Sequence, residues 1–423
     1  MAIKYLKKSP KTSSTDDTKT TEIVKGLLKD IETNKEQACI DLTKKFDKYD
    51  GEIIVSKERI EEIKKTLDQK TKDDIQFSHE RVRKFAEAQL KNYGQDFETE
   101  LSPGLFAGQK LVPVNTAGCY IPGGRYAHIA SAVMSVTTAK VAGVKNIIAC
   151  SPPKEGVGAH PTIVYTANLC GADVILNLGG VPGVASMTNG LFKNPPADII
   201  VGPGNQFVTA AKQWATKFQV AIDLPAGPSE LLVAADATSN PNYVAADLLS
   251  QAEHGPDSQV VLVSTSSSLI EAVRKAIDVQ LEQLPRKEIA TQALENSKAI
   301  LVASDAAAID LINAYAPEHY IIMTENEQDY IDGVQNAGSV FIGAYTPESA
   351  GDYASGTNHT LPTNGYARQY SGVNLDSFMK AITFQKITDN GLQKLGPAIE
   401  IMATAEGLEA HKNAISIRLK DLL

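Results

Sequence analysis

Cysteine is scarce in this chain, which has four cysteines among 423 residues. Cys39, Cys119, Cys150 and Cys170 lie far apart, so the sequence contains neither a CxxC redox motif nor a cysteine-rich zinc module. The pattern is typical of reduced, mostly buried thiols in a cytosolic protein.

Aromatic residues and positive charge are also in short supply. Aromatic residues make up 6% of the chain against 43% hydrophobic residues, so the core must rely mainly on Ala, Val, Ile and Leu. The length suits two or three domains with ample apolar material to bury. A formal net charge of −9 argues against a nucleic-acid scaffold.

Long apolar runs are absent from the sequence. No stretch approaches the roughly 18 apolar residues that a membrane-spanning helix needs, and the N-terminus has no charged-then-apolar leader pattern. We therefore expect a cytoplasmic protein without a membrane partner.

Several common motifs of nucleotide and hydrolytic enzymes are missing as well. Phe207 stands where a GxGxxG fingerprint beginning at Gly202 and Gly204 would have its third glycine, and no GxxxxGK[ST] loop occurs. HExxH and a nucleophile elbow are also missing. Glycine-rich turns do occur at 118–124, 179–180 and 202–205, near predicted strand ends. They are either ligand-binding turns of an open sheet or simply tight loops.

Short β-rich runs alternate with helical periodicity along most of the chain. The predicted strands are 3–6, 146–149, 174–177, 199–201, 220–222, 231–234, 260–263, 300–303, 320–323 and 340–342. The predicted helices are 22–31, 72–93, 128–142, 161–170, 205–217, 243–254, 268–284, 306–315 and 328–336, and the tail from Asp376 is also predicted to be helical. This alternation predicts βαβ units in two α/β domains with parallel sheets, and helical elements at both ends.

Histidine is rare, with seven in the chain, yet His254, His319, His359 and His411 all lie in the second half, near acids, amides or glycine turns. Nitrogen and oxygen ligands without cysteine suit a divalent metal, zinc or manganese first. Gln251 and His254 are three apart at the end of a predicted helix, so both can meet one ion. The alternative is a polar helix end in solvent.

A second pair, Glu318-His319, directly precedes an apolar predicted strand. A carboxylate and an imidazole at such a junction suit general acid–base chemistry near neutral pH. Adjacent residues on a strand point to opposite sides, however, so the two need not act on one atom. An exposed pair at a sheet edge is the alternative.

Two further segments carry a carboxylate and a histidine. The small and polar loop 351–359 carries Asp352 and His359, although Asp352 alone is equally consistent with a local turn or cap. Glu406 and His411 lie on the C-terminal helical segment, where a solvated helix face is the usual meaning of such residues.

Together these segments resemble the histidinol dehydrogenase family along nearly the whole chain. The matching stretches are YIPGG at Tyr120, GPGNQFVTAAK at Gly202, DLPAGPSE at Asp223, DLLSQAEHGPDSQ at Asp247, NAYAPEH at Asn313, ESAGDYASGTNHTLPT at Glu348 and EGLEAHKNA at Glu406. The resemblance implies a zinc-dependent enzyme that oxidises L-histidinol to L-histidine with two NAD, through an aldehyde.

The resemblance also implies roles for individual residues. The zinc ligands would be Gln251, His254, Asp352 and, from the other subunit of a homodimer, His411. His319 would be the base that takes the hydroxyl proton, and Glu318 would activate the water that attacks the aldehyde. The substrate contacts would be Ser229, His359 and Glu406, the last also from the other subunit, and the NAD contacts Tyr120 and Asn205.

We therefore expect an intertwined homodimer with two Rossmann-like domains in each chain. Residues 21–117 and 230–373 would form the domain with the metal and catalytic residues, and 118–229 the domain on the NAD side. Residues 1–20 would form an N-terminal arm, and 374–423 a C-terminal helical segment that reaches the partner subunit.

Two departures keep the substrate open. Pro182 stands where the family usually has a glutamine that contacts NAD, and proline has no amide to offer. The stretch 117–132 looks more like a related branch, such as sulfopropanediol 3-dehydrogenase, which oxidises a small diol by the same two-step chemistry. For an anionic substrate of that kind, Arg125 or Arg368 would supply the cation.

Two other classes of function remain as alternatives. A metal beside a Glu-His pair is also consistent with a zinc hydrolase, although the hydrolytic motifs named above are missing. The second alternative is an inactive homologue that binds metal or nucleotide. Pro182 suggests it, because this residue cannot make the usual contact with NAD.

Overall fold

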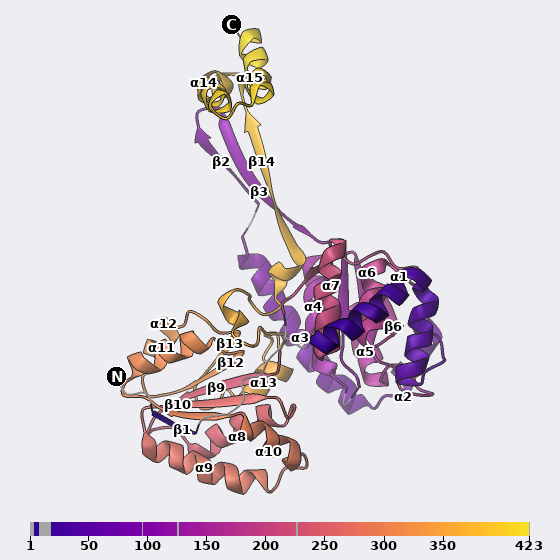
Figure 1. Ribbon diagram of the computed structural model, residues 1–423, viewed down its shortest axis with the longest axis vertical. Helices are drawn as coiled ribbons and strands as arrows, with labels where there is room; N and C mark the ends of the chain where they lie inside the picture. The colour runs from indigo at the N-terminus through magenta and orange to yellow at the C-terminus, as the bar shows by residue number, and fades with distance from the viewer. Residues whose placement is uncertain (1–3, 8–17, 95, 125–126, 226, 423) are drawn as a thin grey trace. The chain divides into compact units, whose positions relative to one another are not determined.

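The computed structural model describes residues 4–7, 18–94, 96–124, 127–225 and 227–422 (Figure 1). Most of the predicted arm 1–20, and Arg125, lie outside these residues. The chain divides into two compact units, one made of Met1–Ala88 and Val114–Phe378 and the other of Gln89–Pro113 and Met379–Leu423. No helix in the described part of the chain is long and apolar enough to cross a membrane.

The first unit contains a five-stranded parallel sheet, here called sheet B. Its strand order is β6-β5-β4-β7-β8. The strands are β4 (Thr116–Tyr120), β5 (Asn146–Ser151), β6 (Val174–Asn177), β7 (Ile199–Val201) and β8 (Ala221–Ile222). The helices that connect them are α4 (Ile129–Ala142), α5 (Pro161–Cys170), α6 (Gly180–Asn189) and α7 (Gln206–Ala215). Nearly all residues of β4, β5 and β7 are buried, as expected for a parallel sheet covered on both faces.

The N-terminal helices are α1 (Thr18–Asp47), α2 (Lys57–Thr66) and α3 (Gln69–Asn92). Val24, Leu28 and Ile31 of α1 are buried in one core cluster with Tyr120 and Leu176 of sheet B. Helix α1 therefore packs on sheet B (Figure 1), whereas the predicted division groups residues 21–117 with the other sheet. The reason is the apolar i, i+4, i+7 face of α1, which sheet B covers.

The first unit also contains a six-stranded sheet, here called sheet A, with the strand order β1-β11-β10-β9-β12-β13. The strands are β1 (Lys4–Lys7), β9 (Glu230–Ala235), β10 (Gln259–Ser264), β11 (Lys298–Leu301), β12 (His319–Met323) and β13 (Ser339–Ile342). All pairings are parallel except that of β1 with β11.

Helices cover both faces of sheet A (Figure 1). Its helices are α8 (Pro241–Ala252), α9 (Ser267–Leu281), α10 (Lys287–Glu295), α11 (Asp305–Tyr315), α12 (Glu327–Asp332) and α13 (Glu348–Tyr353). Along β9, Leu231 and Val233 join the core under α8, α9 and α10, while Leu232 and Ala234 join the core under α11 and α12. The prediction of two Rossmann-like α/β arrangements with parallel sheets is confirmed.

Each parallel sheet has a point where the strand order reverses. In sheet B this switch point lies between β4 and β7, and in sheet A between β9 and β12. Open α/β sheets bind ligands at such a point, usually outside the carboxyl ends of the strands. The two switch points are therefore the places to look for a site.

The second unit is a three-stranded antiparallel sheet with two helices. Its elements are β2 (Phe97–Ser102), β3 (Leu105–Pro113), β14 (Met379–Ile387), α14 (Asp389–Ala405) and α15 (Glu409–Asp421), with strand order β14-β3-β2. The prediction of a helical tail from Asp376 is wrong for Met379–Ile387, because all nine residues of this strand pair with β3. Beyond it the predicted helices are present.

Candidate metal and catalytic site

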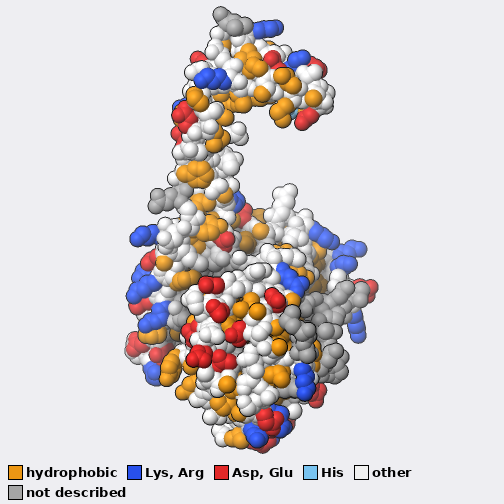
Figure 2. All heavy atoms as spheres, turned by 90° about the vertical axis from the view of Figure 1, so that its left-hand side faces the viewer, with side chains coloured by type: hydrophobic (Ala, Val, Ile, Leu, Met, Phe, Trp, Pro, Cys, Tyr) orange, Lys and Arg blue, Asp and Glu red, His pale blue; other side chains and the backbone are white. Residues whose placement is uncertain are grey.

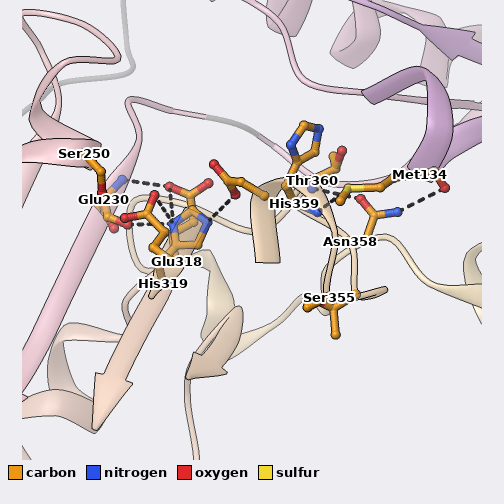
Figure 3. Close-up of polar contacts among 12 residues, drawn as sticks. Met134, Glu230, Ser250, Glu318, His319, Ser355, Asn358, His359 and Thr360 are labelled. Carbon is orange, nitrogen blue, oxygen red and sulfur yellow. Dashed lines mark hydrogen bonds and ion pairs between the residues drawn. The ribbon is translucent and has the colours of Figure 1, made fainter. Parts of the chain in front are cut away.

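The predicted catalytic residues meet at the amino-terminal edge of sheet A. Glu230 begins β9, Glu318 directly precedes β12, and His319 is the first residue of β12. Because α8 runs back against the direction of the strands, its C-terminal end brings Gln251 and His254 to the same edge. Figure 3 shows Glu230, Glu318 and His319 converging there. The site thus lies at the switch point of sheet A, but at the edge opposite to the usual one.

His319 is held in one orientation by the backbone. Its side chain is 4% exposed, and its Nδ1 lies 3.0 Å from the carbonyl oxygen of Glu230. A carbonyl only accepts, so Nδ1 carries a hydrogen and donates it. Nε2 has no hydrogen-bond partner among the described residues and lies 3.5 Å from Asp352 Oδ1, an ion-pair distance. Nε2 is therefore the atom that can exchange a proton with a substrate.

Three carboxylates surround the His319 ring. Glu318 Oε2 lies 3.6 Å and Glu348 Oε1 3.9 Å from Nδ1, and Asp352 lies beside Nε2. Burial alone would lower the pKa of His319, but these carboxylates outweigh it and raise the pKa well above its usual value. These acids therefore favour the doubly protonated form of the ring.

The carboxylates themselves are strongly perturbed by burial. Burial raises the pKa of Glu318 to about 8, against the attraction of His319, and raises the pKa of Glu348 as well. Burial opposes the ionisation of Asp352 too, but the neighbouring His319, His359 and His254 hold the pKa of Asp352 below its usual value. Such a concentration of buried acids favours a cation between them.

The donor set beside His319 fits a divalent metal. Ligand atoms of His254, Glu348 and Asp352 all lie within 4.8 Å of one another. Gln251 is fully buried beside Glu348, and we assign its amide nitrogen as the donor to Glu348, because a carboxylate only accepts; the amide oxygen is then the atom that can face a cation. The C-terminal end of α8 adds partial negative charge here. One imidazole with carboxylate and amide oxygens is a donor set that zinc accepts.

The solvent-exposed alternatives for Gln251 and for the Glu318-His319 pair are wrong. Gln251, Glu318 and His319 have exposed fractions of 0%, 5% and 3%. β12 is an interior strand, so the Glu318-His319 pair does not lie on an edge strand of the sheet.

His359 and Ser229 lie on loops next to this cluster. His359 follows α13, and its Nε2 lies 2.8 Å from Ser131 Oγ of α4, while its backbone N–H donates to Met134 Sδ. Figure 3 shows His359 on this loop beside Met134. Ser229 is half-buried directly before β9, where its carbonyl accepts from the Gln259 N–H. Their substrate contacts stay a prediction.

Tyr120 and Asn205 lie at the other switch point, that of sheet B. Tyr120 ends β4, its ring is buried, and its hydroxyl accepts a hydrogen bond of 3.0 Å from the Gly180 N–H. Asn205 caps α7, where its side chain accepts from the N–H groups of Phe207 and Val208. Pro182 is buried in the first turn of α6, a position that proline tolerates.

Glu406 and His411 belong to the second unit. Glu406 follows α14 and His411 lies in α15, and both side chains are exposed. They are not among the residues that the first unit gathers at sheet A.

Sequence reasoning missed two residues of the cluster. Glu348 lies four residues before Asp352 on one short helix, so the ESAGD spacing was the available signal. Glu230 had no signal of its own, because a strand-initial Glu beside a serine is common.

The fold and the site together define a doubly wound α/β enzyme with an acid–base centre beside divalent-metal donors. The family model for histidinol dehydrogenase matches residues 10–419. The chain belongs to the histidinol dehydrogenase family, whose members are NAD-dependent oxidoreductases. This membership argues against the hydrolase alternative.

Similar proteins cover almost the whole chain. A histidinol dehydrogenase homolog of Pelagibacter ubique is 63% identical over 423 residues, covering 99% of both chains. Histidinol dehydrogenase of Bacteroides thetaiotaomicron is 46% identical, covering 95% of this chain and 93% of the relative. Sulfopropanediol 3-dehydrogenase of Ruegeria pomeroyi is 46% identical, covering 99% and 97%. The crystal structure of histidinol dehydrogenase from Elizabethkingia anophelis has a TM-score of 0.93 at 48% identity, covering 98% and 95%.

Proposed function

We propose that this protein oxidises L-histidinol to L-histidine, the last step of histidine biosynthesis, through an aldehyde and with two NAD. The observation that carries the proposal is the buried His319 in a chain of this family. Its Nε2 has no hydrogen-bond partner among the described residues and lies at a cluster of metal donors.

In this proposal His319 is the base. Its Nδ1–H is committed to the Glu230 carbonyl, so Nε2 accepts the hydroxyl proton while hydride passes from the alcohol carbon to NAD. An alcohol does not ionise near neutral pH, so hydride loss needs such a positioned base. Glu318, with a raised pKa, then takes a proton from the water that adds to the aldehyde, and the hydrate loses the second hydride.

The metal would be zinc, held by Gln251, His254 and Asp352 of one chain and by His411 of a second copy. When bound, the ion would anchor substrate nitrogens and offset the carboxylate charge, which lowers the pKa of His319 toward that of a working base. Helices α8 and α13 of the first unit would hold Gln251 and Asp352 in place, and His254 directly follows α8.

The charge of the site favours histidinol over a sulfonate-bearing diol. Of the three acids in the cluster, Asp352 has its pKa held below the usual value, and its negative charge attracts a substrate with an ammonium and an imidazole. Arg368, one of the two cations considered for a sulfonate, is exposed and donates to the Ala314 carbonyl instead. Ser229, His359 and, from the second copy, Glu406 would contact the substrate.

A homodimer would supply His411 and Glu406 across its interface. The second unit exposes large apolar side chains, including Phe97, Leu101, Phe384, Ile401 and Met402, and Figure 2 shows hydrophobic side chains on its surface. Exposed fractions of 71% for Ile401 and 64% for Met402 are costly for an isolated chain, which supports a second copy as the cover.

NAD would bind at the switch point of sheet B, where Tyr120 and the turn before Asn205 meet. This location follows the general rule for open α/β sheets and needs no GxGxxG fingerprint.

The deciding experiment measures NADH production with L-histidinol and with 2,3-dihydroxypropane-1-sulfonate. We expect two NADH for each histidine formed from histidinol. If only the sulfonate is turned over, the substrate is the diol and not histidinol. The diol is the second candidate, and the relative from Ruegeria pomeroyi favours it. No turnover of either substrate by the zinc-loaded enzyme would favour an inactive homologue.

A His319→Asn variant tests the base. We expect kcat to fall by a factor of about 10² to 10⁴, the usual contribution of a general base, with zinc content close to that of the wild type. Zinc would be measured by atomic absorption. An unchanged kcat would remove His319 from this role.

A further inference from the structure

The turn Gly202–Asn205 is anchored by two buried charges that the proposed chemistry does not use. Lys212 of α7 and Asp223, which follows β8, form an ion pair, with side chains 3% and 0% exposed. Charged side chains are almost never fully buried unless they are paired. The position of this pair, directly behind the turn, therefore needs an explanation.

Each member of the pair holds one side of Gly202. Lys212 Nζ donates to the Gly202 carbonyl at 2.8 Å, and Asp223 Oδ2 accepts from the Gly202 N–H, also at 2.8 Å. Asp223 Oδ1 further accepts from the Leu224 N–H at 2.8 Å. The carbonyl and the N–H of one glycine are thus fixed by two groups that are themselves bound to each other.

Gly202 has little room to move. Its φ is +121°, and a Cβ there would lie 2.0 Å from the Tyr120 carbonyl oxygen. No other residue fits this backbone without a shift. The turn therefore packs closely against the end of β4, at the switch point where we expect a dinucleotide to bind.

The energetics of the Lys212–Asp223 ion pair favour a role in positioning the turn over a role in stabilising the fold. A buried ion pair recovers little or none of the cost of removing both charges from water, and apolar residues of similar volume often stabilise a fold equally well. Its two charges, however, impose one geometry on the groups that they bind. A turn fixed before the cofactor arrives loses less conformational freedom on binding.

We propose that the Lys212–Asp223 ion pair is a positioning device that holds the Gly202–Asn205 turn in its NAD-binding form. The proposal rests on the proposed NAD site at Tyr120 and Asn205. It makes Lys212 and Asp223 determinants of NAD affinity without contact between either side chain and NAD.

The test compares Lys212→Met, Asp223→Asn and the double variant in the zinc-loaded enzyme. NAD dissociation constants are measured by calorimetry, with KM for NAD and for histidinol measured in parallel. We expect each single variant to weaken NAD binding about tenfold, as for a loss of roughly 1.4 kcal/mol, with KM for histidinol unchanged. The double variant leaves no unpaired charge, so it should fold, yet still bind NAD weakly.

Two controls separate positioning from general destabilisation. Ile163→Ala, at a fully buried position of α5, should lower the melting temperature without changing NAD affinity. Lys70→Met removes an exposed ion pair with Asp74 and should change neither.

Three outcomes would overturn the proposal. One is wild-type NAD affinity in both single variants, and another is wild-type affinity in the double variant. The third is a loss confined to Lys212→Met, which would indicate direct contact of this lysine with NAD. Asn205→Ala tests the NAD site independently: if it leaves NAD affinity unchanged, the site assignment fails, whatever the ion-pair variants do.

Discussion

Glu230 is a buried carboxyl group at the start of β9, and it serves the site through its backbone. Its carbonyl accepts from His319, whereas its Oε2 has no hydrogen-bond partner among the described residues. Burial raises the pKa of Glu230 to about 7, although Lys298 and His319 oppose the shift. A carboxyl group of this kind makes stability depend on pH.

A Glu230→Gln variant measures that dependence. Below the ordinary pKa of 4.5 both folded and unfolded chains are protonated here. Between pH 4.5 and about 7 the unfolded chain loses the proton and the folded chain keeps it, so stability falls as pH rises and then levels off. The variant should therefore gain up to about 3 kcal/mol over the wild type at pH 8 and nothing at pH 4.

Urea unfolding at both pH values checks this expectation. Glu325→Gln, an exposed position after β12, is the matched control and should give no pH-dependent difference. A constant difference between Glu230→Gln and the wild type at both pH values would contradict the assigned protonation.

At the residue scale, the sequence predicted the members of the cluster that lie in distinctive motifs. Gln251 and His254 share a helix end, and Glu318-His319 stand at a strand start, so local patterns made them candidates, and the family resemblance supplied their roles. Glu348 was missed because the ESAGD spacing, although it places Glu348 one turn before Asp352, does not show that α13 packs beside α8. The His319 tautomer likewise follows from a partner on another strand.

Among the elements, α1 shows how a long polar helix is held by a few apolar residues. Leu28 is 1% exposed within the core that α1 shares with sheet B, while Ile23 of the same helix is 45% exposed. The contrast predicts that one face of α1 provides most of its stabilisation.

Leu28→Ala tests this face. Removing a buried leucine side chain typically costs about 2–5 kcal/mol, and we expect the free energy of unfolding to fall within this range. Ile23→Ala should cost less than about 1 kcal/mol, because most of its side chain is already in water. Chemical denaturation of both variants gives the comparison, and equal losses would show that α1 does not pack through this face.

At the same scale, most parallel strands were predicted to within two residues, because buried runs between glycine turns are distinctive, but the parallel strand β4 was not among the predicted strands. Strand β14 was missed, and so was its partner β3. Every residue of β14 is half-buried or exposed, so no buried apolar run identifies it as a strand. Its pairing, Met379 with Pro113 at one end, is with a segment far away in the sequence.

For the whole molecule, the sharing of a site between two copies is the main expectation, and mixed dimers test it. His319→Asn and His411→Asn should each be inactive alone. Co-expressed, they should regain about a quarter of wild-type activity, because half of the dimers are mixed and each mixed dimer has one intact site. No recovery in isolated mixed dimers would mean that each chain completes its own site.

The sequence alone predicted the two α/β arrangements of the molecule but no assembly. The assembly was inferred from family resemblance, because His411 and Glu406 have no local pattern that distinguishes them from a solvated helix face. The exposed apolar side chains on the second unit indicate that another protein surface covers them, but they do not identify that surface.

The position of His319 at the start of β12 has a practical consequence for engineering. Since the candidate residues gather where the strands of sheet A begin, the loops where these strands finish carry none of the residues assigned here to catalysis. The exposed Glu325-Asn326 connection after β12 is one such loop. A fluorescent label or affinity handle placed there would report on the enzyme while leaving its chemistry intact.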